Sequence, residues 1–175
     1  GFVVMLLAMQ FNYQQLKNKR LVYSLLLLTI LALMMVFGFS SSNGAHRWIK
    51  LPGVSLQPSE LSKLVLIIFL AYFLEKRAGE EGDFWRTFVP CGFITAFLAG
   101  LVVIEPDLGT AMMLVLIFVV MIYTAGARLK HLALAAAPAL IVVSGLLIFV
   151  PWRLKRMITF LDPWADPQGS GFQVV

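Results

Sequence analysis

Two aspartates near the end of the chain, Asp162 and Asp166, are the residues whose type and spacing most suggest chemistry. A proline follows each of them, which biases the acid toward extended backbone and argues against a helix. They come after the apolar run 132–150, which is long enough to cross a bilayer. Both carboxylates are therefore expected in a stiffened loop at a membrane surface, where one can serve as a general base on a membrane-embedded substrate. The alternative is that an aspartate only forms a turn. Asp162, followed by Pro163, fits that role well, whereas we do not expect both aspartates to be turn formers only.

Three cations stand between that apolar run and the acids: Arg153, Lys155 and Arg156. They can bind an anionic substrate, and we take Arg153 and Arg156 as candidate substrate-binding residues. Snorkelling of the long side chains toward lipid headgroups explains them equally well.

A second group of polar residues surrounds a predicted helix start at Pro58, since proline suits the first turn of a helix. Lys63 would lie one turn inside a membrane helix, where an amine is costly unless it faces a cavity or a partner. Arg47 and Lys63 can together clamp a phosphate, arginine by a forked contact and lysine as a point charge. In the purely structural alternative, Glu60 and Lys63 form an i,i+3 ion pair, and Arg47 with Trp48 anchors the chain at the interface.

A third group, Glu105 and Asp107, lies between two apolar stretches with almost no loop. Asp107 is predicted to cap the helix that begins at Leu108, because its oxygens can accept backbone N–H groups there. Glu105 has no comparable local role. It is expected to pair with Arg47, with Lys63 or with a residue outside this chain.

The composition indicates that membrane helices position these groups. Sixty per cent of the 175 residues are hydrophobic and the mean hydropathy is +0.88, which leaves too little polar surface for a soluble domain. We predict an all-α fold, a polytopic transmembrane helix bundle that forms a single domain over residues 1–175. We expect it to belong to a longer protein, because the chain starts without methionine and stops within a loop. The predicted apolar segments are 1–11, 21–39, 59–74, 87–104, 108–124 and 132–150.

The distribution of lysine and arginine predicts the orientation of these segments. If all of them span, connections 12–20, 75–86 and 125–131 share one side and carry eight lysines and arginines. The other side carries five, in the loops at about 40–58 and 151–175 and around 105–107. The positive-inside rule makes the first side cytoplasmic, and the chemically dense loops are then on the outer side.

Other function classes find little support. The net charge of +5 comes from cations scattered at the ends of apolar segments, which does not suit nucleic-acid binding. Cys91 is alone, so no disulfide forms within the chain. His46 and His131 are isolated, and we expect no tightly held transition metal.

Three motifs together resemble the SEDS family (shape, elongation, division and sporulation), the group of RodA, FtsW and SpoVE. They are Arg47-Trp48 with Leu56-Gln57-Pro58-Ser59-Glu60-Leu61-Ser62-Lys63; Glu105-Pro106-Asp107-Leu108-Gly109-Thr110; and Phe160-Leu161-Asp162-Pro163-Trp164-Ala165-Asp166-Pro167 with Gly169-Ser170-Gly171-Phe172-Gln173. Their order and spacing also agree with the family, and the resemblance covers the whole chain.

The resemblance implies part of a bundle of about ten membrane helices, from the end of the second through the seventh and into the large outer loop that follows. It implies polymerisation of lipid II into peptidoglycan glycan strands at the outer face of the bacterial cytoplasmic membrane. A class B penicillin-binding protein is the implied partner. By motif position, the family's essential aspartate corresponds to Asp166, with Asp162 second, and its functional arginine and lysine correspond to Arg47 and Lys63.

The expected reaction is inverting glycosyl transfer, with Asp166 as the base and undecaprenyl pyrophosphate as the leaving group. The substrate-binding candidates are Arg47, Trp48, Glu60, Lys63, Glu105, Arg153 and Arg156. A bridging divalent cation such as Mg²⁺ is compatible with this set. The alternatives are a lipid II flippase, which would use the same charges for transport, and a scaffold that only recruits enzymes. The choice among elongation, division and sporulation stays open.

Overall fold

The computed structural model describes residues 9, 13–36, 49–51, 54–79, 83–127, 129–133 and 144–145. The chain divides into two units, residues 1–128 and 129–175. The second unit is described only at 129–133 and 144–145, as short helical pieces. All of the labelled helices and strands therefore belong to the first unit, and the predicted single domain over 1–175 stays a prediction.

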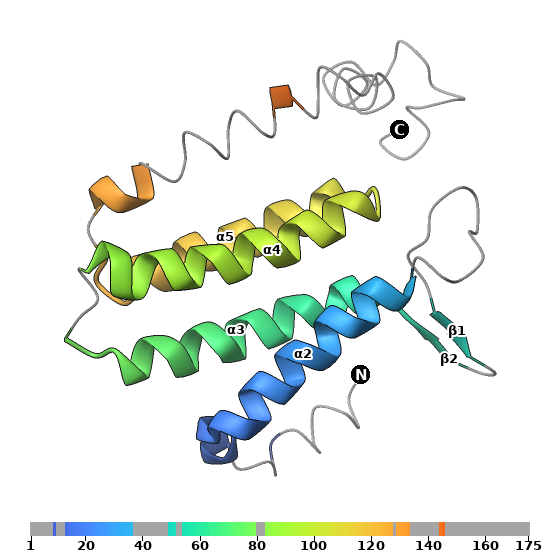
Figure 1. Cartoon of the computed structure of the whole chain (residues 1–175), viewed down its shortest axis with the longest axis horizontal. Helices are drawn as coiled ribbons and strands as arrows, with labels where there is room; N and C mark the ends of the chain where they lie inside the picture. Colours follow the sequence, from blue (N-terminus) through green and yellow to red (C-terminus); the bar gives the residue numbers. More distant parts are fainter. Residues whose placement is uncertain are drawn as a thin grey trace. The chain divides into compact units, whose positions relative to one another are not determined.

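The described part of the first unit contains four long helices, and successive helices run in opposite directions (Figure 1). They are α2 (Lys19–Val36), α3 (Pro58–Lys76), α4 (Val89–Ile104) and α5 (Leu108–Thr124). A 3-10 turn, η1 (Tyr13–Lys17), precedes α2, and a π-helical turn, η2 (Phe84–Phe88), leads into α4. Helix α2 packs on α3, α4 packs on α5, and α3 packs on α5.

These helices confirm four of the predicted apolar segments, at 21–39, 59–74, 87–104 and 108–124. The remaining two, 1–11 and 132–150, fall almost entirely outside the described residues. Helix α3 extends the short segment at 59–74 by Pro58 at its start and by two residues at its end.

The helices begin where the sequence supplies a start signal. The side chain of Asn18 accepts a hydrogen bond from the backbone N–H of Arg20 at 3.0 Å, at the start of α2. Pro58 occupies the first turn of α3, as predicted. Asp83 accepts from two backbone N–H groups of η2, at 3.0 and 3.1 Å. Asp83 falls in the connection predicted at 75–86, to which no cap was assigned from the sequence, so this cap was not predicted.

The packing of these helices is that of a membrane protein. The spans Lys19–Val36 and Phe84–Ile104 are long and apolar enough to cross a bilayer, and α5 is a shorter apolar helix. Large apolar side chains are exposed on the outside of the unit, whereas small hydroxyl residues are buried between helices. Small residues let helix backbones approach closely, and hydroxyl groups can hydrogen-bond within a helix or across to its neighbour. The buried hydroxyl residues are Thr29, Ser59, Ser62, Thr87, Thr95 and Thr110.

A short antiparallel hairpin stands directly before α3, and it was not predicted (Figure 1). Strand β1 (Ile49–Leu51) pairs with β2 (Val54–Leu56), with Lys50 opposite Ser55. The expected loop at 40–58 therefore contains regular structure. Each strand has the apolar–polar–apolar pattern of a half-buried strand, and a Pro-Gly dipeptide separates them, so a signal for this hairpin was present.

Candidate functional site

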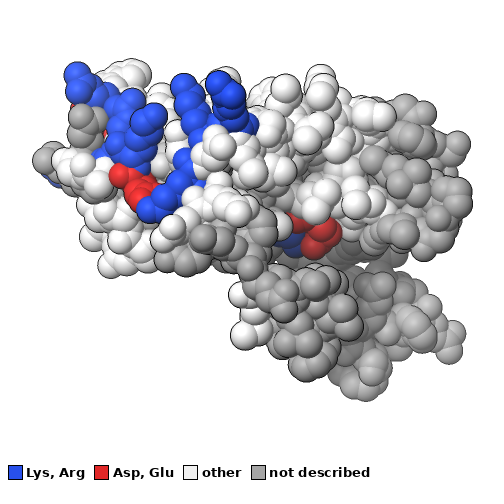
Figure 2. All heavy atoms as spheres, turned by 90° about the horizontal axis from the view of Figure 1, so that it is seen from below, with Lys and Arg blue, Asp and Glu red and all other residues white. Residues whose placement is uncertain are grey.

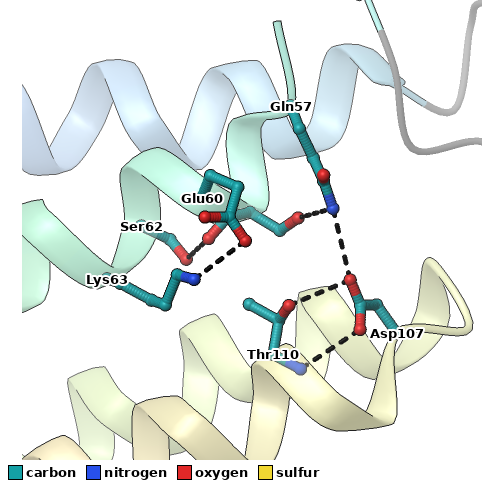
Figure 3. A network of polar contacts seen from close by, with 7 residues as sticks. Gln57, Glu60, Ser62, Lys63, Asp107 and Thr110 are labelled. Carbon is teal, nitrogen blue, oxygen red and sulfur yellow. Dashed lines mark hydrogen bonds and ion pairs between the residues drawn. The ribbon is translucent and has the colours of Figure 1, made fainter. Parts of the chain in front are cut away.

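The start of α3, the end of α4 and the start of α5 share one end of the bundle, and most of the described candidate site lies there (Figure 3). Gln57, the residue before α3, donates from Nε2 to Ser59 Oγ at 2.9 Å. The same amide donates to Asp107 Oδ2 at 3.3 Å. A polar network therefore connects two helix beginnings that are about 50 residues apart in the chain.

Asp107 caps α5, which confirms the prediction for this residue. Its Oδ1 accepts from the backbone N–H of Thr110 at 3.1 Å, and its Oδ2 accepts from the Thr110 hydroxyl at 3.0 Å. The carboxylate also lies at the positive end of the dipole of α5, and these contacts stabilise the start of the helix. The carboxylate is thus stabilised by local partners and is not available as a freely moving group.

The first turns of α3 are inserted tightly into the bundle. Pro58, Ser59 and Ser62 are buried, and the Ser62 hydroxyl donates to the backbone carbonyl of Ser59 at 2.6 Å. Because these residues hold one face of α3 inside, Glu60 and Lys63 are left at the edge of the packed face.

Glu60 and Lys63 form the i,i+3 ion pair of the structural alternative, with Lys63 Nζ 2.8 Å from Glu60 Oε1. The Lys63 side chain is 26% exposed and that of Glu60 is 56% exposed. A pair that is this exposed stabilises a fold by only about 0–1 kcal/mol. The ion pair is therefore present, but it offsets little of the cost that is expected for an amine one turn inside a membrane helix. The ammonium carries three donors, and the pair uses one of them.

Glu105 ends α4 with a side chain that is fully buried. Its backbone N–H donates to the carbonyl of Leu101 at 3.2 Å. A carboxylate at a helix C-terminus faces the negative end of the helix dipole, and burial adds a desolvation cost. A buried acid in such a place inside a membrane bundle is a functional candidate by default. Lys63 forms its ion pair with Glu60. The predicted ion pair between Lys63 and Glu105 is therefore not observed.

Several predicted site residues lie outside the described residues. They are Arg47, Trp48, Arg153, Arg156, Asp162 and Asp166. The predicted proximity of Asp166 to Arg47 and Lys63 therefore stays a prediction. Within the described ranges, no cluster of three or more His, Cys, Asp or Glu residues could hold a metal ion.

The structure adds Gln57 and Thr110 to the site, residues to which no role was assigned from the sequence. Thr110 stands three residues after Asp107, the spacing at which a capping side chain meets the helix backbone, so it could have been found. Gln57 could not, because its contact with Asp107 depends on how α3 packs on α5.

Comparison with known proteins decides the family. Residues 1–175 match the family described as "Cell cycle protein", which groups FtsW, RodA and SpoVE. The chain belongs to this family, as its three motifs predicted. SEDS proteins are integral proteins of the bacterial cytoplasmic membrane, and the expected localisation is therefore confirmed.

Several SEDS relatives are similar over most of the chain. Two are named "Probable peptidoglycan glycosyltransferase FtsW". The one from Acinetobacter baylyi is 37% identical over 153 residues, which cover 87% of this chain and 38% of the relative. The one from Aliivibrio salmonicida is 39% identical over 161 residues, covering 90% and 40%. Stage V sporulation protein E of Bacillus subtilis is 36% identical over 178 residues, covering 100% and 48%. The chain thus spans less than half the length of these relatives.

A solved structure supports the same assignment. One chain of a peptidoglycan synthase complex, described as coordinating polymerization and crosslinking, matches with a TM-score of 0.74 at 32% identity. The match covers 99% of this chain and 51% of the solved chain. The predicted fold class, a polytopic helical membrane bundle, is confirmed by this similarity.

Proposed function

We propose that the SEDS protein to which this chain belongs polymerises lipid II into glycan strands at the outer face of the membrane. The observation that carries the proposal is the identity of 37% and 39% to relatives named as peptidoglycan glycosyltransferases. Two of the three motifs that predicted this function from the sequence also build the described part of the site.

The described residues suit the binding of a lipid-linked pyrophosphate. Lys63 is partly exposed at the edge of α3 and retains donors for an anionic oxygen. Asp107 and Gln57 hold the starts of α5 and α3 together beside it. Lys63 therefore belongs to a helix whose beginning is hydrogen-bonded to a neighbouring helix, and not to a loop. A rigid element of this kind favours the precise placement of its charge.

The proposed chemistry is a displacement with inversion at the donor sugar. The carboxylate of Asp166 takes the proton from the 4-hydroxyl of the acceptor N-acetylglucosamine, and that oxygen forms a bond to C1 of the donor's muramic sugar. The bond between C1 and the pyrophosphate oxygen breaks, and undecaprenyl pyrophosphate leaves with the electron pair. A positioned base contributes about 10²–10⁴-fold to the rate.

Cations stabilise the charge that gathers on the leaving pyrophosphate. Lys63 and Arg47 are proposed for this role, with Arg153 or Arg156 as further donors. Because arginine forks onto two oxygens and lysine offers a point charge, the pair can hold both phosphates in one orientation.

A class B penicillin-binding protein is the proposed partner. Support comes from the solved chain of 32% identity, whose complex is described as coordinating polymerization and crosslinking. A second polypeptide that crosslinks the strands would use the glycan product directly.

The test is polymer formation from labelled lipid II by the full-length protein with its partner. We expect Asp166→Asn to abolish polymerisation while the protein still folds, and Asp162→Asn to retain more activity than Asp166→Asn.

In the same assay, Lys63→Met should lower the polymerisation rate at least about tenfold, since methionine keeps an apolar stem and removes the charge.

Full polymerisation by Asp166→Asn would reject the assigned base. Intact lipid II that changes leaflet in proteoliposomes, with no polymer formed, would favour transport instead. A protein unaffected by Asp166→Asn, Arg47→Ala and Lys63→Ala together would be a scaffold.

A further inference from the structure

A hollow of about 350 Å³ lies at the opposite end of the bundle from the candidate site. Its lining residues come from the beginning of α2 and the end of α3. These two helices are antiparallel and pack on each other (Figure 1). Its volume falls within the range of about 300–1,000 Å³ that is usual for small-ligand pockets. The residues that line it are Lys19, Tyr23, Tyr72, Phe73, Lys76, Arg77 and Ala78.

The hollow is basic, and its cations make cation–π contacts with aromatic rings. Lys19 Nζ lies 5.9 Å from the centre of the Tyr23 ring. Lys76 Nζ lies 5.8 Å from the centre of the Tyr72 ring. The two tyrosines meet edge to face at 6.3 Å, which joins the two cation–aromatic pairs across the α2–α3 interface. The charges are thereby positioned by both helices.

A third cation completes the lining. The guanidinium of Arg77 lies 5.5 Å from the centre of the Phe73 ring. Within the part of the chain that the structure describes, none of the residues that line the hollow is acidic. The neighbouring acid Glu75 binds Lys17 at 2.6 Å, so a cation outside the lining compensates its charge.

The position of the hollow suits a lipid headgroup. Figure 2 shows lysine and arginine side chains gathered at one end of the face in view. The lining cations belong to the helix ends that the distribution of charges predicts to be cytoplasmic, and tyrosines with basic residues are typical of the membrane interface. Basic clusters just outside membrane helices attract anionic lipids.

We propose that this hollow binds the phosphate of an anionic phospholipid in the adjacent leaflet, through Lys19, Lys76 and Arg77. The acyl chains would extend along the exposed apolar surface of α2, on which Leu27, Leu28 and Leu31 are exposed. A lipid held there would contact both α2 and α3 and would fasten their ends together. This site is separate from the one proposed for polymerisation.

The experiment measures lipid binding to the purified full-length protein by native mass spectrometry. The probes are dioleoyl phosphatidylglycerol and, for comparison, dioleoyl phosphatidylcholine. We expect the triple variant Lys19→Gln, Lys76→Gln, Arg77→Gln to weaken phosphatidylglycerol binding by about tenfold or more and to leave phosphatidylcholine binding unchanged.

A matched triple variant controls for net charge. Arg20→Gln, Arg86→Gln and Lys130→Gln remove three exposed cations from the same predicted side, and none of them lines the hollow. We expect less than about a twofold effect from this control. Equal losses in the two triple variants, or no loss in the first, would overturn the proposal.

Tyr72→Leu provides a second variant that changes no charge. It removes the ring beneath Lys76 and the contact with Tyr23, and should weaken phosphatidylglycerol binding by about threefold. Unchanged binding in Tyr72→Leu would contradict the role of the aromatic platform. Displacement of the lipid by an equal concentration of glycerol 3-phosphate would also overturn the proposal, because phosphate alone would then suffice.

Binding is measured without lipid II, so these outcomes do not depend on polymerisation. A protein that fails to polymerise lipid II but discriminates phosphatidylglycerol would reject the proposed function and keep this inference.

Discussion

At the scale of single residues, the carboxylate of Asp107 joins the beginnings of two helices. It caps α5 through Thr110 and accepts the amide of Gln57 at the start of α3. We expect Asp107→Ala to lower the free energy of unfolding by about 1–2 kcal/mol, because the cap and the interhelical contact are lost together. Denaturation of the full-length protein in mixed detergent micelles measures this change.

Asp107→Asn is the control, since its amide oxygen can still cap the backbone N–H of Thr110. It should lose less than Asp107→Ala. If the alanine variant were as stable as the parent, the cap would contribute nothing measurable and the network would have to be maintained by Gln57 and Ser59 alone.

The same residues mark how far the sequence could predict the site. The cap at Asp107 and the pair between Glu60 and Lys63 are local, so spacing along the chain was enough to predict both. The full burial of Glu105 depends on packing between helices, which no local pattern encodes. Lys63 was also a predicted partner for Glu105, and in the structure its ion pair is with Glu60.

At the scale of elements, the end of α5 is a tight reversal that depends on Gly126, whose φ is +97°. Its N–H donates to the carbonyl of Tyr123 at 3.0 Å, and the N–H of Ala127 donates to that of Ile122 at 3.1 Å. This is the Schellman arrangement, which requires a left-handed residue. We expect Gly126→Ala to lower the free energy of unfolding by about 1 kcal/mol, measured by the same denaturation assay.

Gly100→Ala is the matched control in α4. At both glycines the position that a Cβ would occupy has open space around it, so the two substitutions differ in backbone conformation rather than in room for the methyl group. Alanine favours a helix interior, and Gly100→Ala should be neutral or stabilising. Equal effects at both positions would show that the left-handed conformation is not what Gly126 supplies.

Hydropathy predicted the helices well because a membrane imposes length and apolarity on every span. The bounds predicted at 108–124 are those of α5, and the others agree within a few residues. The hairpin of β1 and β2 was missed because three-residue strands produce too weak a periodicity to compete with the expectation of a loop.

At the scale of the whole molecule, the antiparallel helices separate two kinds of chemistry. Lys63 lies at the end where α3 and α5 begin, together with Glu60, Glu105 and Asp107. The basic hollow lies at the end where α3 finishes. The proposed functions require these ends to face opposite sides of the membrane. Eight lysines and arginines on one side against five on the other predict that the basic hollow faces the cytoplasm. A direct measurement of the orientation tests this prediction.

Labelling with a membrane-impermeant maleimide provides that measurement, in spheroplasts that produce the full-length protein. We expect Lys50→Cys, in β1, to react in intact spheroplasts, whereas Arg86→Cys, in η2, should react only after permeabilisation. The parent protein gives the background, to which Cys91 should contribute little because it is buried in α4. The opposite pattern would place Lys63 and Glu105 near the cytoplasm. Because lipid II is polymerised at the outer face in the proposed mechanism, that result would remove the described site from the reaction.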